Sequence, residues 1–253
     1  RFRAEFGRFK KAVLAKSRVA FRSFSEGLPL QWEGYKERIH QVANERLAVS
    51  TWRASEIGSG EILGRVIHAI KIEKSHEPGN NLVAWTLRYG PTGQAHRRLL
   101  EALEDQSACK KLERVLFDLY RDRIADAEAF ELLAELIGRR YDVLAYLFFL
   151  KNWENYMPIS PSNFDLAFKQ LEVDVATAHK CSWENYLRYN AALQAVRRAI
   201  DNHGGIGPVR LLDAHSFCWM LARLGLPAQA LSIQIPCRQQ WHQFGGRSRP
   251  LAR

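Results

Sequence analysis

The sequence predicts a mainly α-helical protein with a multi-helix, bundle-like body. Apolar residues recur every three or four positions along most of the chain, which is the period of a helix with one buried face. The chain has 253 residues, of which 47% are apolar, and this is enough to bury a sizeable core. The longest apolar run, near Val143–Leu150, is too short to cross a bilayer and suits a central buried helix.

The N-terminal segment has the pattern of a basic amphipathic helix that ends near Gly27. Phe2, Phe6, Phe9 and Val13 lie at helical spacing, and this stripe favours docking of the helix on the body. Cationic side chains occupy the other faces and are expected to be exposed: Arg3, Arg8, Lys10, Lys11, Arg18 and Arg22.

The next part of the chain is less regular. A helix is expected over about 35–47. Residues 63–72 fit either a helix or a short buried strand, because periodicity alone does not separate the two. Clusters of turn-forming residues follow at 75–81 and 89–93. The sequence therefore allows a few short strands in the 50–95 region.

The helical pattern is strongest from Ala95 to about 225. Gly138 and Ser182 stand where one helix is expected to end and another to begin. Helices are expected at 127–137, 141–150, 164–171, 183–200 and 209–224. Three parts follow from these patterns: 1–94 with the basic helix and an irregular segment, 95–225 as the helical core domain, and 226–253 as a basic, flexible tail.

The net charge of +10 is concentrated at the two ends of the chain. Residues 1–24 hold eight Lys and Arg against one acid, and residues 214–253 hold five Arg and no acid. Concentrated positive charge attracts a polyanion, because neutralised phosphates release condensed counterions. Nucleic acid is therefore the expected partner, DNA in preference to RNA. An acidic protein partner and a solubilising role are the alternatives.

Cysteine usage and the absence of a signal segment favour a cytoplasmic protein without a membrane partner. The four cysteines form no CxxC pair and no disulfide framework. His215, Cys218, Cys237 and His242 could be combined into a zinc site, but the second pair is loosely spaced. Because Cys218 lies in an apolar run, a buried structural cysteine is favoured, and no metal or cofactor is expected.

The chain contains no recognisable catalytic motif. Asp165, Glu172 and Asp174, with Lys169, could serve a nuclease, but they fit a helix surface and cap better. There is no P-loop, dinucleotide-binding fingerprint or Gly-x-Ser-x-Gly elbow. The sequence therefore favours a binding protein over an enzyme.

The glycine-rich segment Gly204–Pro208 resembles the hairpin of helix-hairpin-helix proteins. That hairpin presents backbone N–H groups to a DNA phosphate, a role that would fall here to Gly205 and Gly207. The resemblance also implies that Asp213 falls on the following helix, roughly at the position where base-excision glycosylases of that superfamily have a carboxylate. His203 stands where an apolar residue is expected, and the hairpin has no lysine. A glycine-rich loop between two helices is therefore the favoured interpretation.

Two aromatic residues at a proline-rich helix junction, Trp153 and Tyr156, could stack on an unpaired base. Tryptophan belongs more often to a core, which is the favoured interpretation. The tetrapeptide Trp-Glu-Asn-Tyr that contains them recurs at Trp183–Tyr186. Because the flanking residues differ, the recurrence is interpreted as coincidence.

Several short segments between about 140 and 220 carry a family resemblance. They are Phe148–Lys151, Tyr156–Ile159, Phe164–Asp165, Phe168, Cys181–Tyr186 and Leu211–Phe217. In these segments the chain is similar to helical modules of bacterial restriction and phage-defence proteins, including McrB-like modification-dependent systems. The resemblance implies a DNA-reading or adaptor module in a defence complex whose other subunits carry cleavage or NTP hydrolysis.

We therefore expect a non-catalytic DNA-binding module of a bacterial defence (restriction-type) protein. The expected contacts are the six cations of the N-terminal segment, the backbone of Gly205 and Gly207, and Arg247 and Arg249 of the C-terminal tail. Two alternatives stay open. One is a DNA-acting enzyme of the glycosylase type, and the other is a scaffold whose basic helix docks on an acidic subunit.

Overall fold

The computed structural model describes residues 1–73, 79–86 and 93–224, and the regular elements in these ranges are all helical. The predicted mainly α-helical, multi-helix body is confirmed. Within the same ranges, no helix is both long and apolar enough to cross a bilayer.

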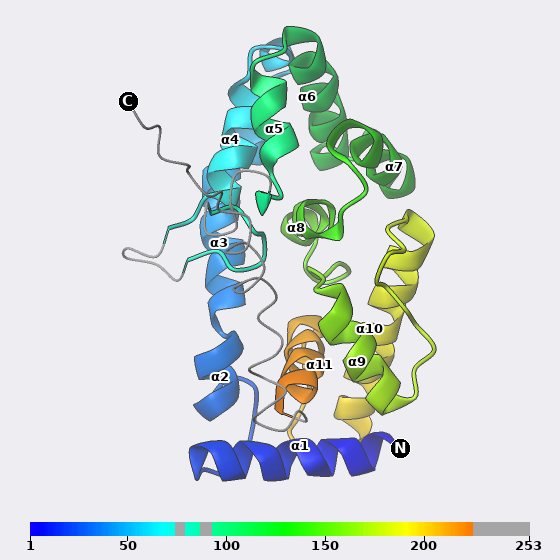
Figure 1. The fold of residues 1–253 in the computed structure, drawn as a ribbon. Helices are drawn as coiled ribbons and strands as arrows, with labels where there is room; N and C mark the ends of the chain where they lie inside the picture. Colours follow the sequence, from blue (N-terminus) through cyan, green and yellow to red (C-terminus); the bar gives the residue numbers. More distant parts are fainter. Residues whose placement is uncertain (74–78, 87–92, 225–253) are drawn as a thin grey trace, which may run out of the picture.

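The first four helices form the base and one side of the molecule in Figure 1. They are α1 (Phe2–Ser17), α2 (Gly27–Glu33), α3 (Tyr35–Leu47) and α4 (Glu61–Ile70). Helix α1 lies across the bottom of the view, and α2, α3 and α4 rise from one end of it. Helices α3 and α4 pack against each other along this column.

The later helices fill the rest of the molecule. They are α5 (Arg97–Leu103), α6 (Gln106–Tyr120), α7 (Asp126–Ile137), α8 (Tyr141–Lys151), α9 (Pro161–Leu171), α10 (Trp183–His203) and α11 (Leu211–Leu224). Figure 1 places α8 near the centre, with α9, α10 and α11 between it and α1. Helix α11 contacts α1, α2, α9 and α10, so it joins the two ends of the described chain.

The irregular region before α5 contains no strand among the residues described there. Two short 3₁₀ turns, Val49–Thr51 and Ala54–Glu56, precede α4. Residues 63–72, which the sequence leaves open between helix and strand, lie mostly in α4. Its buried apolar residues follow the helical period rather than alternation: Ile62, Leu63, Val66, Ile67 and Ile70. Among the described residues of the 50–95 region, helix and turns therefore stand where the sequence allows short strands.

Local signals in the sequence set several helix ends, and those at Ser182 and Gly138 are as predicted. The Asp105 side chain accepts the Ala108 N–H at the start of α6, and Ser182 accepts the Asn185 N–H at the start of α10. Gly138 follows α7 with a φ of 96°, a conformation that glycine adopts without steric cost.

Helix α8 is the buried central helix that its apolar sequence predicts. All of its residues except Asp142 and Lys151 are buried. The Tyr146 hydroxyl donates to the Ala69 carbonyl at 2.9 Å, which satisfies a polar group inside the core. The hydrophobic core around α8 includes residues from both sides of position 95, where the sequence places a boundary.

Candidate functional site

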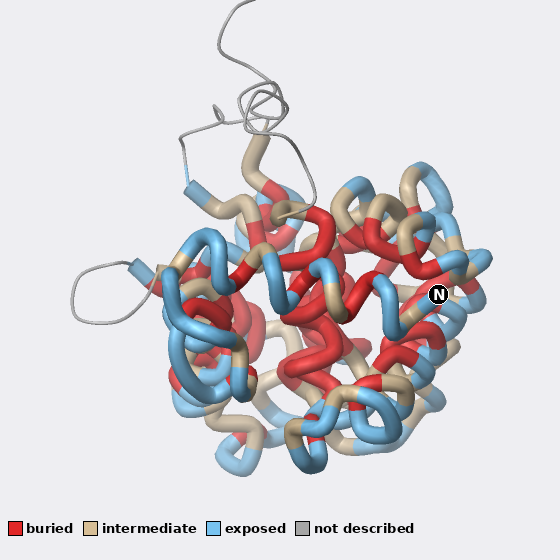
Figure 2. The backbone as a smooth tube through the Cα atoms, turned by 90° about the horizontal axis from the view of Figure 1, so that it is seen from below, coloured by how far each residue is buried: buried red, intermediate tan, exposed pale blue. Residues whose placement is uncertain are grey.

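Helix α1 is docked on the body by aromatic packing. The rings of Phe6 and Phe9 are buried, with centroids 5.5 and 5.1 Å from that of Phe217 on α11. Phe21 adds an edge-to-face contact with Phe9 at 5.0 Å. Figure 2 looks onto this helix from below, and buried and exposed positions alternate along its turns. The phenylalanine stripe thus packs as predicted and holds the opposite side of α1 in solvent.

Most cations of the N-terminal segment are free of carboxylates. Arg8 is an exception, because its guanidinium lies 2.9 Å from the buried Glu5 carboxylate, which also pairs with Arg1 at 3.2 Å. The other five predicted cations are exposed, with no carboxylate within 4.0 Å in the described ranges: Arg3, Lys10, Lys11, Arg18 and Arg22. We call these five side chains the α1 cationic surface.

The geometry of a helix distributes these charges over one flank and the outer side of α1. Arg3 and Lys10 are seven residues apart and so share a flank, while Lys11 lies about 100° further round the axis. Arg18 follows directly in the left-handed conformation, with a φ of 59°, and turns the chain toward Arg22. A long anionic ligand could contact several of these side chains at once.

The glycine-rich loop after α10 lies beside the N-terminal end of α1. The Arg3 guanidinium is 3.3 Å from His203 Nδ1, and the Phe2 and His203 ring centroids are 6.4 Å apart. Gly205 and Gly207 are exposed, with φ of 67° and 78°. A Cβ atom at either position would meet nothing within 4 Å, so this backbone is open to a ligand. The structure brings the predicted glycine pair next to the cationic surface.

Asp213, which a glycosylase-like site would use, serves as a cap for α11. Its carboxylate accepts the Arg210 backbone N–H at 2.8 Å and pairs with the Arg210 guanidinium at 3.0 Å. These bonds, with the Glu37 carboxylate 2.9 Å from the same guanidinium, raise the pKa of Arg210. A carboxylate that is only 9% exposed and already engaged in this way is poorly placed to attack a sugar or a base.

Asp165, one of the acids considered for a nuclease site, also has structural partners. Asp165 accepts both the backbone N–H and the hydroxyl of Thr177 at 2.7 Å, and the Ala178 N–H at 3.0 Å. It therefore fixes the loop after α9. No group of three or more His, Cys, Asp or Glu side chains that could hold a metal ion occurs in the described part of the chain.

Four residues named in the sequence analysis lie outside the described residues: Arg247, Arg249, Cys237 and His242. The two remaining members of the possible zinc set are His215 and Cys218 on α11. Both are buried, and burial raises the pKa of the Cys218 thiol well above its ordinary value. Cys218 is thus a buried thiol, as the sequence favours.

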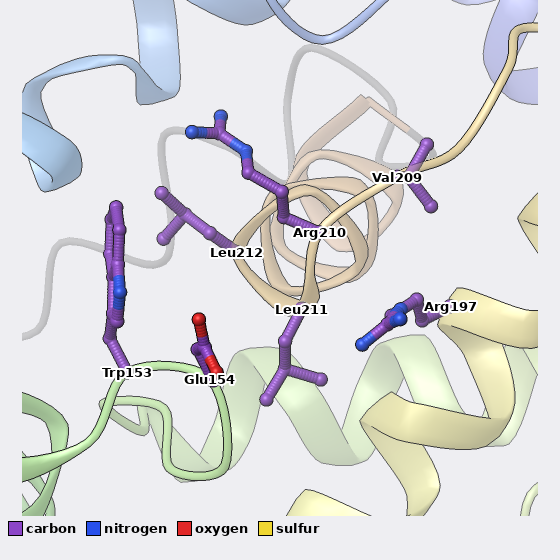
Figure 3. A pocket seen from close by; sticks show the side chains of 7 residues that line it. All are labelled: Trp153, Glu154, Arg197, Val209, Arg210, Leu211 and Leu212. Carbon is purple, nitrogen blue, oxygen red and sulfur yellow. The ribbon is translucent and has the colours of Figure 1, made fainter.

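Trp153 lines a cavity of about 310 Å³ beside the start of α11 (Figure 3). Arg197 of α10 and Arg210 lie on other sides of the same cavity. One face of the Trp153 ring is covered by His40, which stacks on it with centroids 4.5 Å apart and planes 10° apart. Burial lowers the pKa of His40 to about 4, so this ring is neutral at neutral pH.

Tyr156 does not join Trp153 as a second stacking platform. Its hydroxyl donates to Asp126 at 2.6 Å, and its ring packs against Trp183 and Tyr186 of α10. The two aromatic residues that the sequence pairs therefore have separate surroundings. Tyr156 lies at the edge of the core.

A second cavity, of about 300 Å³, lies between α2, α3, α9 and α11. Besides Tyr35, three titratable residues line it, and none of the three is more than 4% exposed: Glu33, Lys36 and His215. Lys36 Nζ contacts the Glu33 carboxylate and lies 2.8 Å from His215 Nδ1. His215 Nε2 is 2.9 Å from the Pro158 carbonyl. We call these three side chains the buried triad.

The hydrogen bonds of the buried triad define its protonation. A carbonyl only accepts, so His215 Nε2 carries the hydrogen and Nδ1 accepts from Lys36. Burial and the nearby Lys36 charge lower the pKa of His215 well below its ordinary value, which keeps the ring neutral. Burial raises the pKa of Glu33 and lowers that of Lys36, while their mutual attraction opposes both shifts. The triad as a whole is electrically neutral.

Helical spacing could have identified Lys36 but not its partners. Lys36 precedes Ile39, Ala43 and Leu47 by three, seven and eleven residues, so it lies on the buried face of α3. A lysine at such a position indicates a paired charge inside the protein. His215 comes 179 residues later, and spacing does not connect the two.

Comparison of the chain with protein-family models, with curated proteins and with solved structures found no match. The similarity to restriction and phage-defence modules therefore stays an expectation.

Proposed function

We propose that this protein binds nucleic acid, DNA in preference to RNA, through the α1 cationic surface. The observation that carries the proposal is the set of five exposed cations with no described carboxylate within 4.0 Å, on a segment fixed by aromatic packing. Neutralising phosphates on such a surface releases counterions, which gives sequence-independent affinity. The exposed backbone of Gly205 and Gly207, next to Arg3, offers N–H groups to the same strand.

The biological setting is part of the same proposal. We infer a non-catalytic, cytoplasmic DNA-binding module of a bacterial defence (restriction-type) system, with other subunits as partners. The family resemblance over about 140–220 supports this setting. The engagement of Asp213 in a helix cap speaks against the glycosylase alternative.

The test compares two adjacent lysine pairs in the full chain. Lys10→Glu/Lys11→Glu reverses two charges of the α1 cationic surface, and Lys110→Glu/Lys111→Glu reverses two equally exposed charges on α6. Fluorescence anisotropy with a labelled 20-base-pair duplex measures the affinity between 50 and 200 mM salt, a range over which phosphate contacts weaken strongly.

We expect the affinity of the α1 variant to fall about tenfold or more. The slope of log K against log salt should become less steep by about two. The α6 variant should retain most of the wild-type affinity. Equal losses in both variants, or no binding by the wild-type chain at 50 mM salt, would contradict the proposal.

A scaffold role is the second candidate, favoured by two exposed apolar side chains among the cations. Leu14 and Val19 are 48% and 59% exposed, and such residues suit a protein partner better than a phosphate backbone. In that case Leu14→Ser would weaken capture of an acidic protein while leaving the affinity for the duplex unchanged.

A further inference from the structure

The cavity that contains the buried triad has the size and shape of a small-molecule site. Its volume of about 300 Å³ lies at the lower end of the range of about 300–1,000 Å³ that ligand pockets occupy. Four helices contribute to its walls, so it is a feature of the packed fold rather than of one loop. None of the residues named for the α1 cationic surface lines it.

Aromatic side chains form much of the wall of this cavity. Trp32 and Trp219 stand edge to face with centroids 6.4 Å apart, and Tyr35 and Phe164 complete the aromatic lining. Neither tryptophan is fully buried. Walls of this kind bind flat rings, because every planar heterocycle has a π face that stacks on them.

The polar groups of the cavity offer a donor beside an acceptor. Lys36 Nζ has three hydrogens and uses two of them on Glu33 and His215, which leaves one for a ligand. The Glu33 carboxylate next to it is the acceptor. A neighbouring donor and acceptor match the hydrogen-bonding edge of a nucleobase. Because the triad is neutral overall, the interior suits an uncharged ring rather than a phosphate.

Each tryptophan of the cavity also carries a cation on its ring. Lys16 Nζ of α1 is 5.5 Å from the centroid of Trp32, and the Arg223 guanidinium is 5.2 Å from that of Trp219. These two charges can hold a phosphate outside the neutral interior. Lys16 also places this cavity at the end of the helix that bears the α1 cationic surface.

We infer that the cavity lined by Trp32, Trp219 and the buried triad binds a nucleobase, with the attached phosphate held by Lys16 and Arg223. The base can belong to a free nucleotide or to an unpaired position of a bound strand. The second source rests on the proposed function, and the first does not. A base that leaves its stack exchanges contact with neighbouring bases for contact with these aromatic walls.

The first arm of the test uses free nucleoside monophosphates and isothermal titration calorimetry on the full chain. We expect Trp32→Leu and Trp219→Leu to weaken binding about tenfold or more each. Trp153→Leu, which removes a tryptophan from the other cavity, is the matched control and should bind as the wild type does. Lys16→Gln, an exposed change that leaves the core intact, should weaken binding of the monophosphate about threefold but not that of the nucleoside.

The second arm measures the affinity for two duplexes of the same length, one fully paired and one with a single unpaired nucleotide. We expect the wild type to prefer the second, and Trp32→Leu and Trp219→Leu to lose this preference while keeping their affinity for the paired duplex. Circular dichroism melting verifies that each variant is folded.

The two arms separate the inference from the proposed function. Nucleotide binding that depends on the two tryptophans, without duplex binding, supports the inference that the cavity binds a nucleobase and contradicts the proposed function. The chain could instead bind the duplex while neither its affinity for free nucleotides nor its preference for the unpaired nucleotide depends on Trp32 or Trp219. That result would overturn the cavity inference and leave the proposed function standing.

Discussion

Two buried glutamates, Glu113 and Glu33, are held in different ways. Glu113 on α6 is fully buried and accepts backbone N–H groups of Gly58, Gly60 and Leu63 at 2.6, 3.3 and 2.9 Å. It caps the N-terminal end of α4 from another helix, where the helix dipole favours a negative charge. Backbone donors cannot change their protonation, so this carboxylate has a fixed structural role.

Glu33 is almost as deeply buried, at 4% exposed, but Lys36 is its charged partner. Both groups titrate, and both line a cavity rather than a closed core. The comparison teaches that burial of a charge is not by itself a sign of function. The chemistry of the partner and the neighbouring space distinguish a structural carboxylate from a candidate site.

The largest effect is expected at Glu113. Replacement by Gln removes the negative charge and sets an amide NH₂ against the backbone donors of one of the two carboxylate oxygens, which should destabilise the fold by about 3 kcal/mol. Chemical denaturation measures the change in the free energy of unfolding. Glu104→Gln, on the exposed end of α5, is the control and should change it by less than about 0.5 kcal/mol. A small effect at Glu113 would mean that its carboxylate is not a structural cap, which is the role that distinguishes it from Glu33.

The second effect concerns the partner of Glu33. Lys36→Met leaves a buried carboxylate without its main cation and should cost about 3 kcal/mol at pH 7, the lower end for a broken buried pair, because Ser216 and Arg223 still favour the charged form. Burial raises the pKa of Glu33 in the folded state above its unfolded value, so its unfavourable ionisation is avoided at low pH. The loss should therefore be smaller at pH 5 than at pH 7. Denaturation at both values tests this, and Glu33→Gln/Lys36→Met should recover most of the stability.

A third, smaller effect is expected at His40. Its pKa is lowered to about 4 in the fold, against about 6.5 when unfolded, so the folded state binds fewer protons between these values. Stability from the neutral ring is fully present above pH 6.5 and is lost as the pH falls toward 4.

His40→Phe keeps a ring against Trp153 and removes this titration. The measurement is the free energy of unfolding of the variant minus that of the wild type. This difference should be about 1 kcal/mol more favourable to the variant at pH 5 than at pH 8, a value reduced for the partial solvent exposure of His40. The acid-induced loss that is left then belongs to the other groups with shifted pKa values, which include His96 and the buried triad. An unchanged pH dependence would mean that the pKa of His40 is the same in the folded and unfolded states.

The smallest effect is expected at an exposed carboxylate. Glu101 on α5 pairs with Arg97 at 2.6 Å, and both side chains are exposed to solvent. Glu101→Gln should cost at most about 0.5 kcal/mol, and 1 M salt should abolish the difference. Thermal melting at low and high salt measures it. A larger or salt-insensitive loss would show that exposure alone does not separate this carboxylate from the buried ones.

Local rules predicted the helical fold, because its signals are short-range. The apolar run of α8, the Ser182 cap and Gly138 each act within a few residues. The tetrapeptide Trp-Glu-Asn-Tyr marks the limit of such rules. Its first copy, from Trp153, lies in a turn after α8, and its second, from Trp183, begins α10. The same four residues adopt different structures because their flanks and caps differ.

The candidate site was only partly predictable, since its contacts join distant parts of the chain. The positive charge of the α1 segment can be read from its composition. The ion pair between Arg8 and Glu5, however, depends on how deeply Glu5 is buried, which the sequence does not show. The pairing of Lys36 with His215 arises from the packing of α3 beside α11. No spacing rule connects residues that far apart.

The aromatic docking of α1 limits how far the chain can be shortened from its N-terminal side. Removal of the first 17 residues would uncover the rings of Phe21, Phe24 and Phe217, which α1 now shields. Such an exposed aromatic surface promotes self-association. Shortened versions of this protein that lack α1 should aggregate, so a truncation that abolishes binding would report on aggregation and not on loss of the charges of α1.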